Sequence, residues 1–338
     1  MDPNNHTYSQ YALVREMLET ADVVRKFDPQ CSARFAETVE KKQKLFLTGE
    51  GSSRIFPAKR AIYHAMKEAF PYPVTTEGAT QALEYALDEY AVFGASNSGK
   101  TKEVIRLFKS LKESRHQAFY GLTANENTPL EELALETHIL QCGKEDAVAA
   151  TKSVIEQGLF YDSLFHHLQN KKMTGLKELA DHLELAMKAD VDPAIVYMLK
   201  NADVLYFAGR NTGVAEELTL KTNEITRKKS DFLEGTYALH GIEEVMDKNE
   251  VVVIIDPFES EEEKFQTCLA DGVGMKIVAI SSRQTRFPTL VINSENLYKE
   301  YIELAAGWNL LVETGIALGI NLDKPVRARK VGNEFTTD

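Results

Sequence analysis

The segment Ser96-Asn97-Ser98-Gly99-Lys100-Thr101 gathers three hydroxyl side chains, a glycine and a lysine directly after an apolar run. Small hydroxylated residues let a phosphate dianion approach the backbone, and they donate O–H groups beside the free N–H groups that begin a helix. Gly49-Glu50-Gly51-Ser52-Ser53 has a similar character. Serine and glycine also cap helices and turn chains, so capping alone is the competing interpretation. We predict that these two loops hold a phosphate, with Thr101 in the first helical turn and Lys100 adding charge.

The elements that must position these loops are short apolar strands that alternate with amphipathic helical stretches. This alternation is typical of βαβ units and of a mostly parallel α/β sheet, which binds ligands at the carboxyl ends of its strands. One such helical stretch contains Val104, Leu107, Phe108 and Leu111. The predicted strands are 44–48, 90–95, 117–122, 137–141, 203–208, 250–255, 275–281 and 289–292.

The second series of strands repeats the first. Three pairs of segments correspond: 45–49 with 205–209 at an offset of 160, 89–93 with 250–254 at an offset of 161, and 119–122 with 278–281. Three pairs in register predict a duplicated α/β domain. We place the boundary within residues 188–193, where Asp190, Asp192 and Pro193 end one helix and begin the next. The expected domains are 1–188, an N-terminal helix plus the first copy, and 189–338, the second copy with the C-terminal tail.

The repeat provides an internal comparison for the phosphate loop. At the position expected to match Ser96–Thr101, the second copy reads Pro257-Phe258-Glu259-Ser260-Glu261-Glu262. Both copies need a turn and a helix cap, but glutamates would repel a phosphate. The difference favours a binding role for the loop of the first copy over simple capping.

Bulk composition limits the possible functions. The chain has 338 residues, 43% hydrophobic residues and a formal charge of −12, which argues against nucleic-acid binding. Cys31, Cys142 and Cys268 are widely spaced and are expected to be free thiols. The histidines, with His166 next to His167, do not have a metal-ligand spacing. Neither a signal-peptide pattern nor a membrane-spanning run is evident, so we expect a cytoplasmic protein without metal or cofactor.

These residues resemble the sugar isomerase (SIS) domain family, in which a Ser-x-Ser-Gly-x-Thr loop binds a sugar phosphate. From Tyr11 to Lys330 the chain looks like the two-domain isomerase half of glucosamine-6-phosphate synthase and like stand-alone deaminases of glucosamine 6-phosphate. The resemblance implies two tandem SIS domains of flavodoxin-like three-layer α/β/α architecture. It implies that the phosphate is held by Ser52, Ser53, Ser96, Asn97, Ser98 and Thr101. It also implies that Gly51, Ala150 and Thr151 lie near the sugar, although Ala150 lacks the family's hydroxyl.

The resemblance also assigns catalytic positions by spacing. Lys221-Thr222-Asn223-Glu224 matches the family's Lys-x-x-Glu, His240-Gly241 follows sixteen residues later, and Lys330 follows Pro325 by five. Chemically, a carboxylate such as Glu224 can move a proton between C1 and C2 of an opened sugar, and His240 can move protons on the ring oxygen. Lys221 and Lys330 can stabilise oxyanion charge or form a Schiff base. By residue type alone, Lys221 and Glu224 are also an ordinary surface pair.

Together, the resemblance and this chemistry predict an enzyme of phosphorylated amino sugars that isomerises its substrate and releases ammonia. A plain hexose-phosphate isomerase and a deglycase of phosphorylated fructosamines remain open, because the same Glu224 and His240 serve all three reactions. A non-catalytic sensor of sugar phosphates is the alternative from another class. The resemblance further implies a homodimer in which His240 acts in the neighbouring subunit's site.

Overall fold

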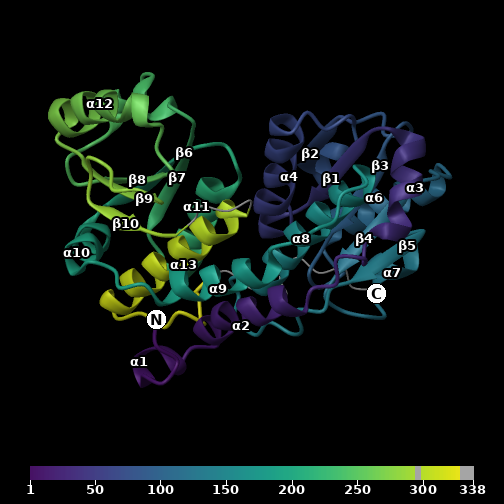
Figure 1. Cartoon of the computed structure of the whole chain (residues 1–338), viewed down its shortest axis with the longest axis horizontal. Coiled ribbons are helices and arrows are strands. Elements are labelled where there is room, and N and C mark those ends of the chain that lie inside the picture. The colour runs from purple at the N-terminus through teal and green to yellow at the C-terminus, as the bar shows by residue number, and fades with distance from the viewer. Residues whose placement is uncertain (294–297, 328–338) are drawn as a thin grey trace. The chain divides into compact units, whose positions relative to one another are not determined.

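The computed structural model describes residues 1–293 and 298–327, which divide into two compact units (Figure 1). The first unit consists of residues 22–145 and 150–176, and the second consists of residues 1–21, 146–149 and 177–327. Each unit is built on one five-stranded sheet. The expected α/β class with two parallel sheets is therefore confirmed.

In the first unit, every strand pairs in parallel in the order β2-β1-β3-β4-β5. The strands are β1 Leu45–Gly49, β2 Val74–Gly78, β3 Ala91–Ala95, β4 Phe119–Thr123 and β5 Glu136–Ile139. The helices are α3 Ala33–Lys42, α4 Ile55–Lys67, α5 Ala79–Ala82, α6 Lys102–Glu113, α7 Pro129–Leu133 and α8 Lys152–Leu168.

Both faces of this sheet are covered, which makes three layers. Leu45 and Leu47 pack with residues of α3, α4 and α8, whereas Phe46 packs with residues of α5, α6 and α7. Alternate residues of one strand point to opposite faces, so a strand buried on both sides must be apolar throughout. All residues of β1, β3 and β4 are buried accordingly.

The second unit repeats this plan with the sheet order β10-β9-β8-β6-β7, again entirely parallel (Figure 1). Its strands are β6 Val204–Gly209, β7 Lys229–Glu234, β8 Val251–Ile255, β9 Lys276–Ser281 and β10 Thr289–Val291. The remaining helices are α1 His6–Ser9, α2 Ala12–Lys26, α9 Leu176–Lys188, α10 Pro193–Asn201, α11 Val214–Thr226, α12 Glu262–Phe265 and α13 Lys299–Ala317, and a π-helical turn covers Gln266–Val273. Across the described ranges, the helices are too short or too polar for any of them to span a bilayer.

The two sheets have the same topology, but the expected alignment was one residue wrong in two of its three pairs. Leu45 pairs with Ala91 in the first sheet, and Leu205 pairs with Val251 in the second, so the offset of 160 also holds for β3 and β8. Phe119 likewise corresponds to Ile277 and not to Val278. In consequence Asp256, rather than Pro257, occupies the position of Ser96. Runs of similar apolar residues match almost equally well after a one-residue slip, and only strand register removes that ambiguity.

The compact units also differ from the expected division at residues 188 and 189. The N-terminal residues and α9 belong with the second sheet, since the amino group of Met1 donates to Met187 O at 3.1 Å. Asn309 of α13 donates to the carbonyls of Ala186 and Ala189 at the end of α9. These contacts join segments far apart in the sequence, so local composition could not reveal them.

Strands β2 and β7 were not predicted from the sequence. Both lie at a sheet edge and read Val-Thr-Thr-Glu-Gly and Lys-Ser-Asp-Phe-Leu-Glu. An edge strand is partly exposed, so it carries the polar and charged residues that a search for apolar runs passes over.

Gly209 ends β6 and leads towards α11. Its φ is +120°, and an added Cβ would lie 2.2 Å from the carbonyl oxygen of Ile255. Gly235 also has a positive φ, of +57°, but open space surrounds the position of its Cβ. We expect the free energy of unfolding to fall by about 1–3 kcal/mol in both Gly209→Ala and Gly235→Ala, because alanine strains the backbone at a positive φ. In Gly209→Ala alone, the free energy of unfolding should fall by about a further 1–3 kcal/mol, because the new Cβ clashes with the carbonyl oxygen of Ile255. Denaturant unfolding of both variants measures the difference, and equal losses would contradict this account.

Candidate active site

Two serine-rich loops lie side by side at the carboxyl edge of the first sheet. They follow β1 and β3, which are neighbouring strands with Gly49 opposite Ala95. Gly51–Ser53 form a single 3-10 turn, and residues 96–101 join β3 to α6. The backbone is crowded at Gly49, because an added Cβ would lie 2.9 Å from Ala95 O and 3.0 Å from Ser53 O. This edge is where open parallel sheets bind their ligands.

The loop between β3 and α6 is held in shape by its own hydroxyls. The hydroxyl oxygens of Ser96 and Thr101 lie 2.7 Å apart, and Thr101 N–H donates to Ser96 Oγ at 3.3 Å. Lys100 N–H donates to Ser98 Oγ at 3.2 Å. Gly99 has a φ of +67°, and an added Cβ would lie 2.4 Å from Thr128 Oγ1. Only glycine fits there, so the turn depends on the Ser-Gly sequence.

Among the residues that the structure describes, two backbone N–H groups at the tip of this loop make no intramolecular hydrogen bond. Within residues 1–293 and 298–327, neither Asn97 N–H nor Ser98 N–H makes a hydrogen bond, whereas the N–H groups of Ser96 and Gly99 bond to Leu122 O and Ser96 O. Free N–H groups beside hydroxyls, at the start of a helix, form a site suited to an anion. Lys100 is exposed and adds positive charge to this part of the surface.

Two of the expected ligand residues use their side-chain donors inside the protein. Asn97 Nδ2 donates to Glu145 Oε2 at 2.6 Å and to Ser153 Oγ at 3.0 Å. Thr151 N–H and Thr151 Oγ1 both donate to Glu145 Oε1, at 2.6 and 3.2 Å. The side chain of Asn97 is therefore used internally, and the Glu145 carboxylate connects the segment around Thr151 to the 96–101 loop.

The remaining residues predicted near the phosphate and sugar are accessible. Ser52, Ser53 and Ala150 are half-buried, and Gly51 is exposed. The carboxylate of the neighbouring Glu50 accepts Ala79 N–H at 2.9 Å, at the start of α5. Burial raises the pKa of Glu50, and this hydrogen bond partly opposes the shift.

In the second unit, α11 carries the Lys221–Glu224 pair that the sequence singled out. Lys221 Nζ lies 2.9 Å from Glu224 Oε2 and 3.3 Å from Glu217 Oε1, one turn earlier on the helix. The side chains of Lys221 and Glu217 are fully buried, whereas 19% of the Glu224 side chain is exposed. Glu224 is thus the member of this acid–base–acid group that solvent or a ligand can reach.

The charge on Lys221 is maintained by its two partners. Burial lowers the pKa of Lys221, but the carboxylates of Glu224 and Glu217 raise it, and the net shift is upward. Lys221 therefore acts as a buried ammonium group that orients Glu224. Its burial fits a positioning role better than the expected Schiff base or direct contact with oxyanion charge.

His240 lies just beyond the short 3-10 turn Tyr237–Leu239 and is exposed. Its Nε2 is 3.5 Å from Thr236 Oγ1, and Gly241, with a φ of +100°, follows it. For the described residues, no hydrogen bond joins His240 to Glu224. Lys330, the fourth expected catalytic residue, lies outside the described residues.

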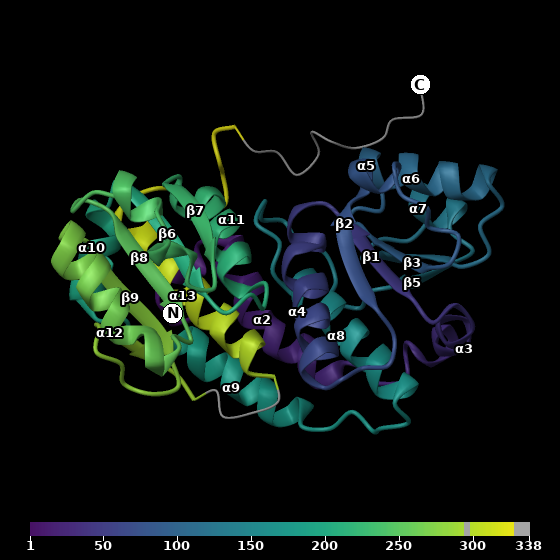
Figure 2. The same cartoon turned by 90° about the horizontal axis from the view of Figure 1, so that it is seen from above.

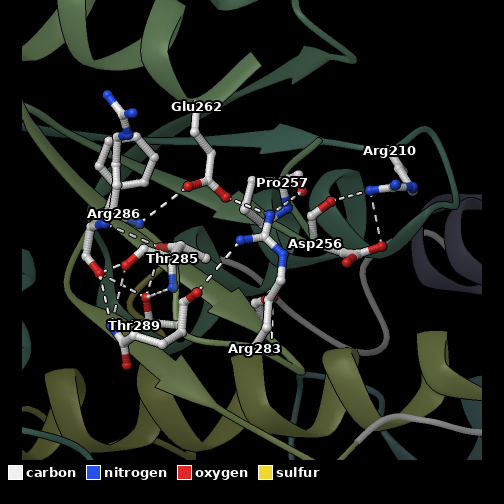
Figure 3. A network of polar contacts seen from close by, with 11 residues as sticks. Arg210, Asp256, Pro257, Glu262, Arg283, Thr285, Arg286 and Thr289 are labelled. Atoms are coloured by element: carbon white, nitrogen blue, oxygen red, sulfur yellow. Dashed lines mark hydrogen bonds and ion pairs between the residues drawn. The ribbon is translucent and has the colours of Figure 1, made fainter. Parts of the chain in front are cut away.

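The corresponding edge of the second sheet carries both cationic and anionic side chains (Figure 3). The expectation of an acidic loop that repels phosphate therefore left out the cations. Asp256 pairs with Arg210 at 2.9 Å and also with Lys299. Glu262 pairs with Arg283 and accepts Arg286 N–H at 3.1 Å. The loop of the first unit has hydroxyls and free N–H groups. At the corresponding edge of the second unit, the charged side chains form ion pairs with one another.

Sequence reasoning missed Glu145, Ser153 and Glu217. Glu217 was detectable, because it lies four residues before Lys221 on the same helical face. Glu145 gave no signal, since it stands 48 residues from Asn97 and only the fold brings the two together. The cations Arg210 and Arg283 were missed for the same reason.

Comparison with known proteins agrees with this description. Residues 38–167 match the SIS domain model. No curated protein sequence matches the chain.

Solved structures share the fold over nearly the whole chain. The C-terminal domain of glucosamine-fructose-6-phosphate aminotransferase from Francisella tularensis superposes with a TM-score of 0.76 at 19% identity, over 94% of this chain and 98% of that one. Glucosamine-6-phosphate deaminase from Thermotoga maritima gives 0.70 at 18% identity, over 94% and 98%. Tagatose-6-phosphate ketose/aldose isomerase from Escherichia coli gives 0.74 at 14% identity, over 95% and 98%. Residues 38–167 thus match the SIS domain model, and nearly the whole chain shares the two-sheet fold of these solved structures.

Proposed function

We propose that this protein is a phosphosugar enzyme that isomerises an amino hexose 6-phosphate and releases its nitrogen as ammonia. The phosphate is bound by the hydroxyls and free N–H groups of the 96–101 loop and by Ser52 and Ser53. Glu224 acts as the base. The observation that carries the proposal is the accessible Glu224 carboxylate, 2.9 Å from the buried ammonium group of Lys221.

The chemistry needs few groups. His240 moves a proton on the ring oxygen and opens the sugar. Glu224 takes the proton from C2 of the open aldose and returns it to C1, which converts the C2 amine into an imine. Water then adds to C2 and ammonia leaves, so that a ketose phosphate remains. Lys221 keeps Glu224 oriented for this transfer.

The same groups serve a plain aldose–ketose isomerase, in which C2 carries a hydroxyl and no ammonia forms, and a deglycase of phosphorylated fructosamines. A screen of hexose and hexosamine 6-phosphates that measures ammonia and ketose together separates these reactions. Ketose without ammonia would contradict the deaminase. Tight sugar-phosphate binding without turnover of any candidate, unchanged in His240→Ala, would indicate a non-catalytic sensor.

Ser98→Ala tests the phosphate loop. The variant removes one hydroxyl from the anion site, and we expect glucosamine 6-phosphate to bind about 10–100-fold more weakly, because hydrogen bonds to charged groups are the stronger ones. Ser260→Ala, an exposed serine of the corresponding loop in the second unit, is the matched control and should leave affinity unchanged. Calorimetric titration measures both, and equal affinities would place the phosphate elsewhere.

Glu224→Gln tests the base. Glutamine keeps the size of the side chain but accepts no proton, so turnover should fall by about 10²–10⁴ while glucosamine 6-phosphate still binds. Glu263→Gln removes the same charge from an exposed position of the second unit and should retain full activity. Undiminished turnover in Glu224→Gln would exclude Glu224 as the base.

Complementation tests whether His240 acts in the neighbouring subunit of a homodimer. Glu224→Gln and His240→Ala subunits, each inactive alone, should recover about a quarter of wild-type activity after mixing, unfolding and refolding together. Half of the dimers are then mixed, and each mixed dimer has one intact site. Wild-type subunits taken through the same treatment are the control. If both residues act within one subunit, no activity returns.

A further inference from the structure

We propose that Glu145 is the positioning residue of the phosphate loop, and that it sets the loop's shape through the Asn97 side chain. The inference rests on the proposed function, because it assigns a role within the same phosphate site. It also gives Ser153 a role, since Ser153 shares the Glu145 carboxylate with Asn97. Neither residue is among those predicted to bind the phosphate.

The two oxygens of Glu145 serve two different segments. Oε2 accepts Asn97 Nδ2 and Ser153 Oγ, each at 2.6 Å. Oε1 accepts Thr151 N–H at 2.6 Å and Thr151 Oγ1 at 3.2 Å. Glu145 is 5% exposed, so water competes little for these bonds. One buried carboxylate therefore joins the phosphate loop to the start of α8.

The partners leave no chemical substitute for a carboxylate at this position. Asn97 Nδ2 and Thr151 N–H are donors only, and they meet opposite oxygens of the same group. Glutamine would turn one of these acceptors into a donor, which then faces another donor across a buried contact. The cost of such an unmatched pair is the reason that the geometry is specific for glutamate.

Asn97 connects this arrangement to the phosphate. Its carbonyl is also fixed, since it accepts Thr123 Oγ1 at 3.1 Å, Asn125 Nδ2 at 2.8 Å and Ala124 N–H at 3.1 Å. With its side chain and carbonyl both held, the peptide planes on either side of Asn97 are fixed. These planes carry the free N–H groups of Asn97 and Ser98. The two groups therefore keep the orientation needed to bind the anion even when no ligand is bound.

The pairing predicts a specific rescue. In Glu145→Gln, the amide oxygen of the new side chain can still accept from Thr151, but its amide nitrogen faces Asn97 Nδ2. Adding Asn97→Asp supplies an acceptor for this amide nitrogen and for Ser153 Oγ, so the hydrogen bonds among positions 97, 145 and 153 are restored with donor and acceptor exchanged between 97 and 145. Recovery by this exchange would assign the loss to the donor–donor contact between positions 145 and 97, and the affinity of the folded variants then reports its effect on the loop.

Calorimetric titration of the full chain with inorganic phosphate and with glucosamine 6-phosphate tests the proposal. We expect Glu145→Gln to weaken both ligands by at least about tenfold and the double variant to recover most of the loss. In turnover, KM should rise and kcat should change little. Glu156→Gln is the matched control, because Glu156 is a buried carboxylate of the same unit that accepts Gln141 N–H outside the loop. It should bind both ligands normally.

The outcomes separate the inference from the proposed function. Wild-type protein that binds no phosphate would overturn the proposed site and the inference with it. Wild-type binding together with unchanged binding in Glu145→Gln would overturn the inference alone. Should Glu145→Gln not fold, Asn97→Asp alone gives the same comparison, since it places two carboxylates face to face. Its affinity must then recover when Glu145→Gln is added, and failure to recover overturns the inference.

Discussion

Parallel pairing of every strand is the constraint from which the candidate site follows. Parallel strands end at the same edge of their sheet, so the segments after β1 and β3 must emerge side by side. The chain then needs only glycine where the backbone is crowded, at Gly49 and Gly99, and hydroxyls where the proposed anion would bind. Helices on both faces force the strands to be apolar, which leaves the ends of the strands as the place where chemistry can vary.

Duplication of this plan shows how far those ends can diverge. With a uniform offset of 160 for the first two strand pairs, Ser96 corresponds to Asp256 and Glu50 to Arg210. Among the described residues, the N–H groups of Asn97 and Ser98 at the first edge make no hydrogen bond. At the second edge, Asp256 pairs with Arg210 (Figure 3) and with Lys299. The second unit carries its distinctive group on the helix after β6, where Lys221 lies between Glu217 and Glu224. Figure 2 shows α11 beside β6 and β7 in that unit.

Sequence patterns predicted what depends on neighbours along the chain. The apolar strands, the serine-rich loops and the Lys221–Glu224 spacing were all visible, because buried strands and helical faces impose a local periodicity. The edge strands β2 and β7 were missed because exposure removes that periodicity. The one-residue slip between the copies arose because apolar strands match equally well in either register. Glu145 could not have been found, since its importance comes from Asn97 and Thr151 meeting it in three dimensions.

The order of segments along the chain has a consequence for biosynthesis. Residues 1–21 belong to the second unit, and most of the first unit is synthesised before the chain returns to the second at residue 177. During translation, the first sheet can close while the N-terminal segment has only residues 146–149 of its own unit to contact. At about 5–20 residues per second, Asn309, which bonds to the end of α9, emerges several seconds later. The exposed apolar face of α2 must therefore be tolerated, or shielded by a chaperone, during that interval.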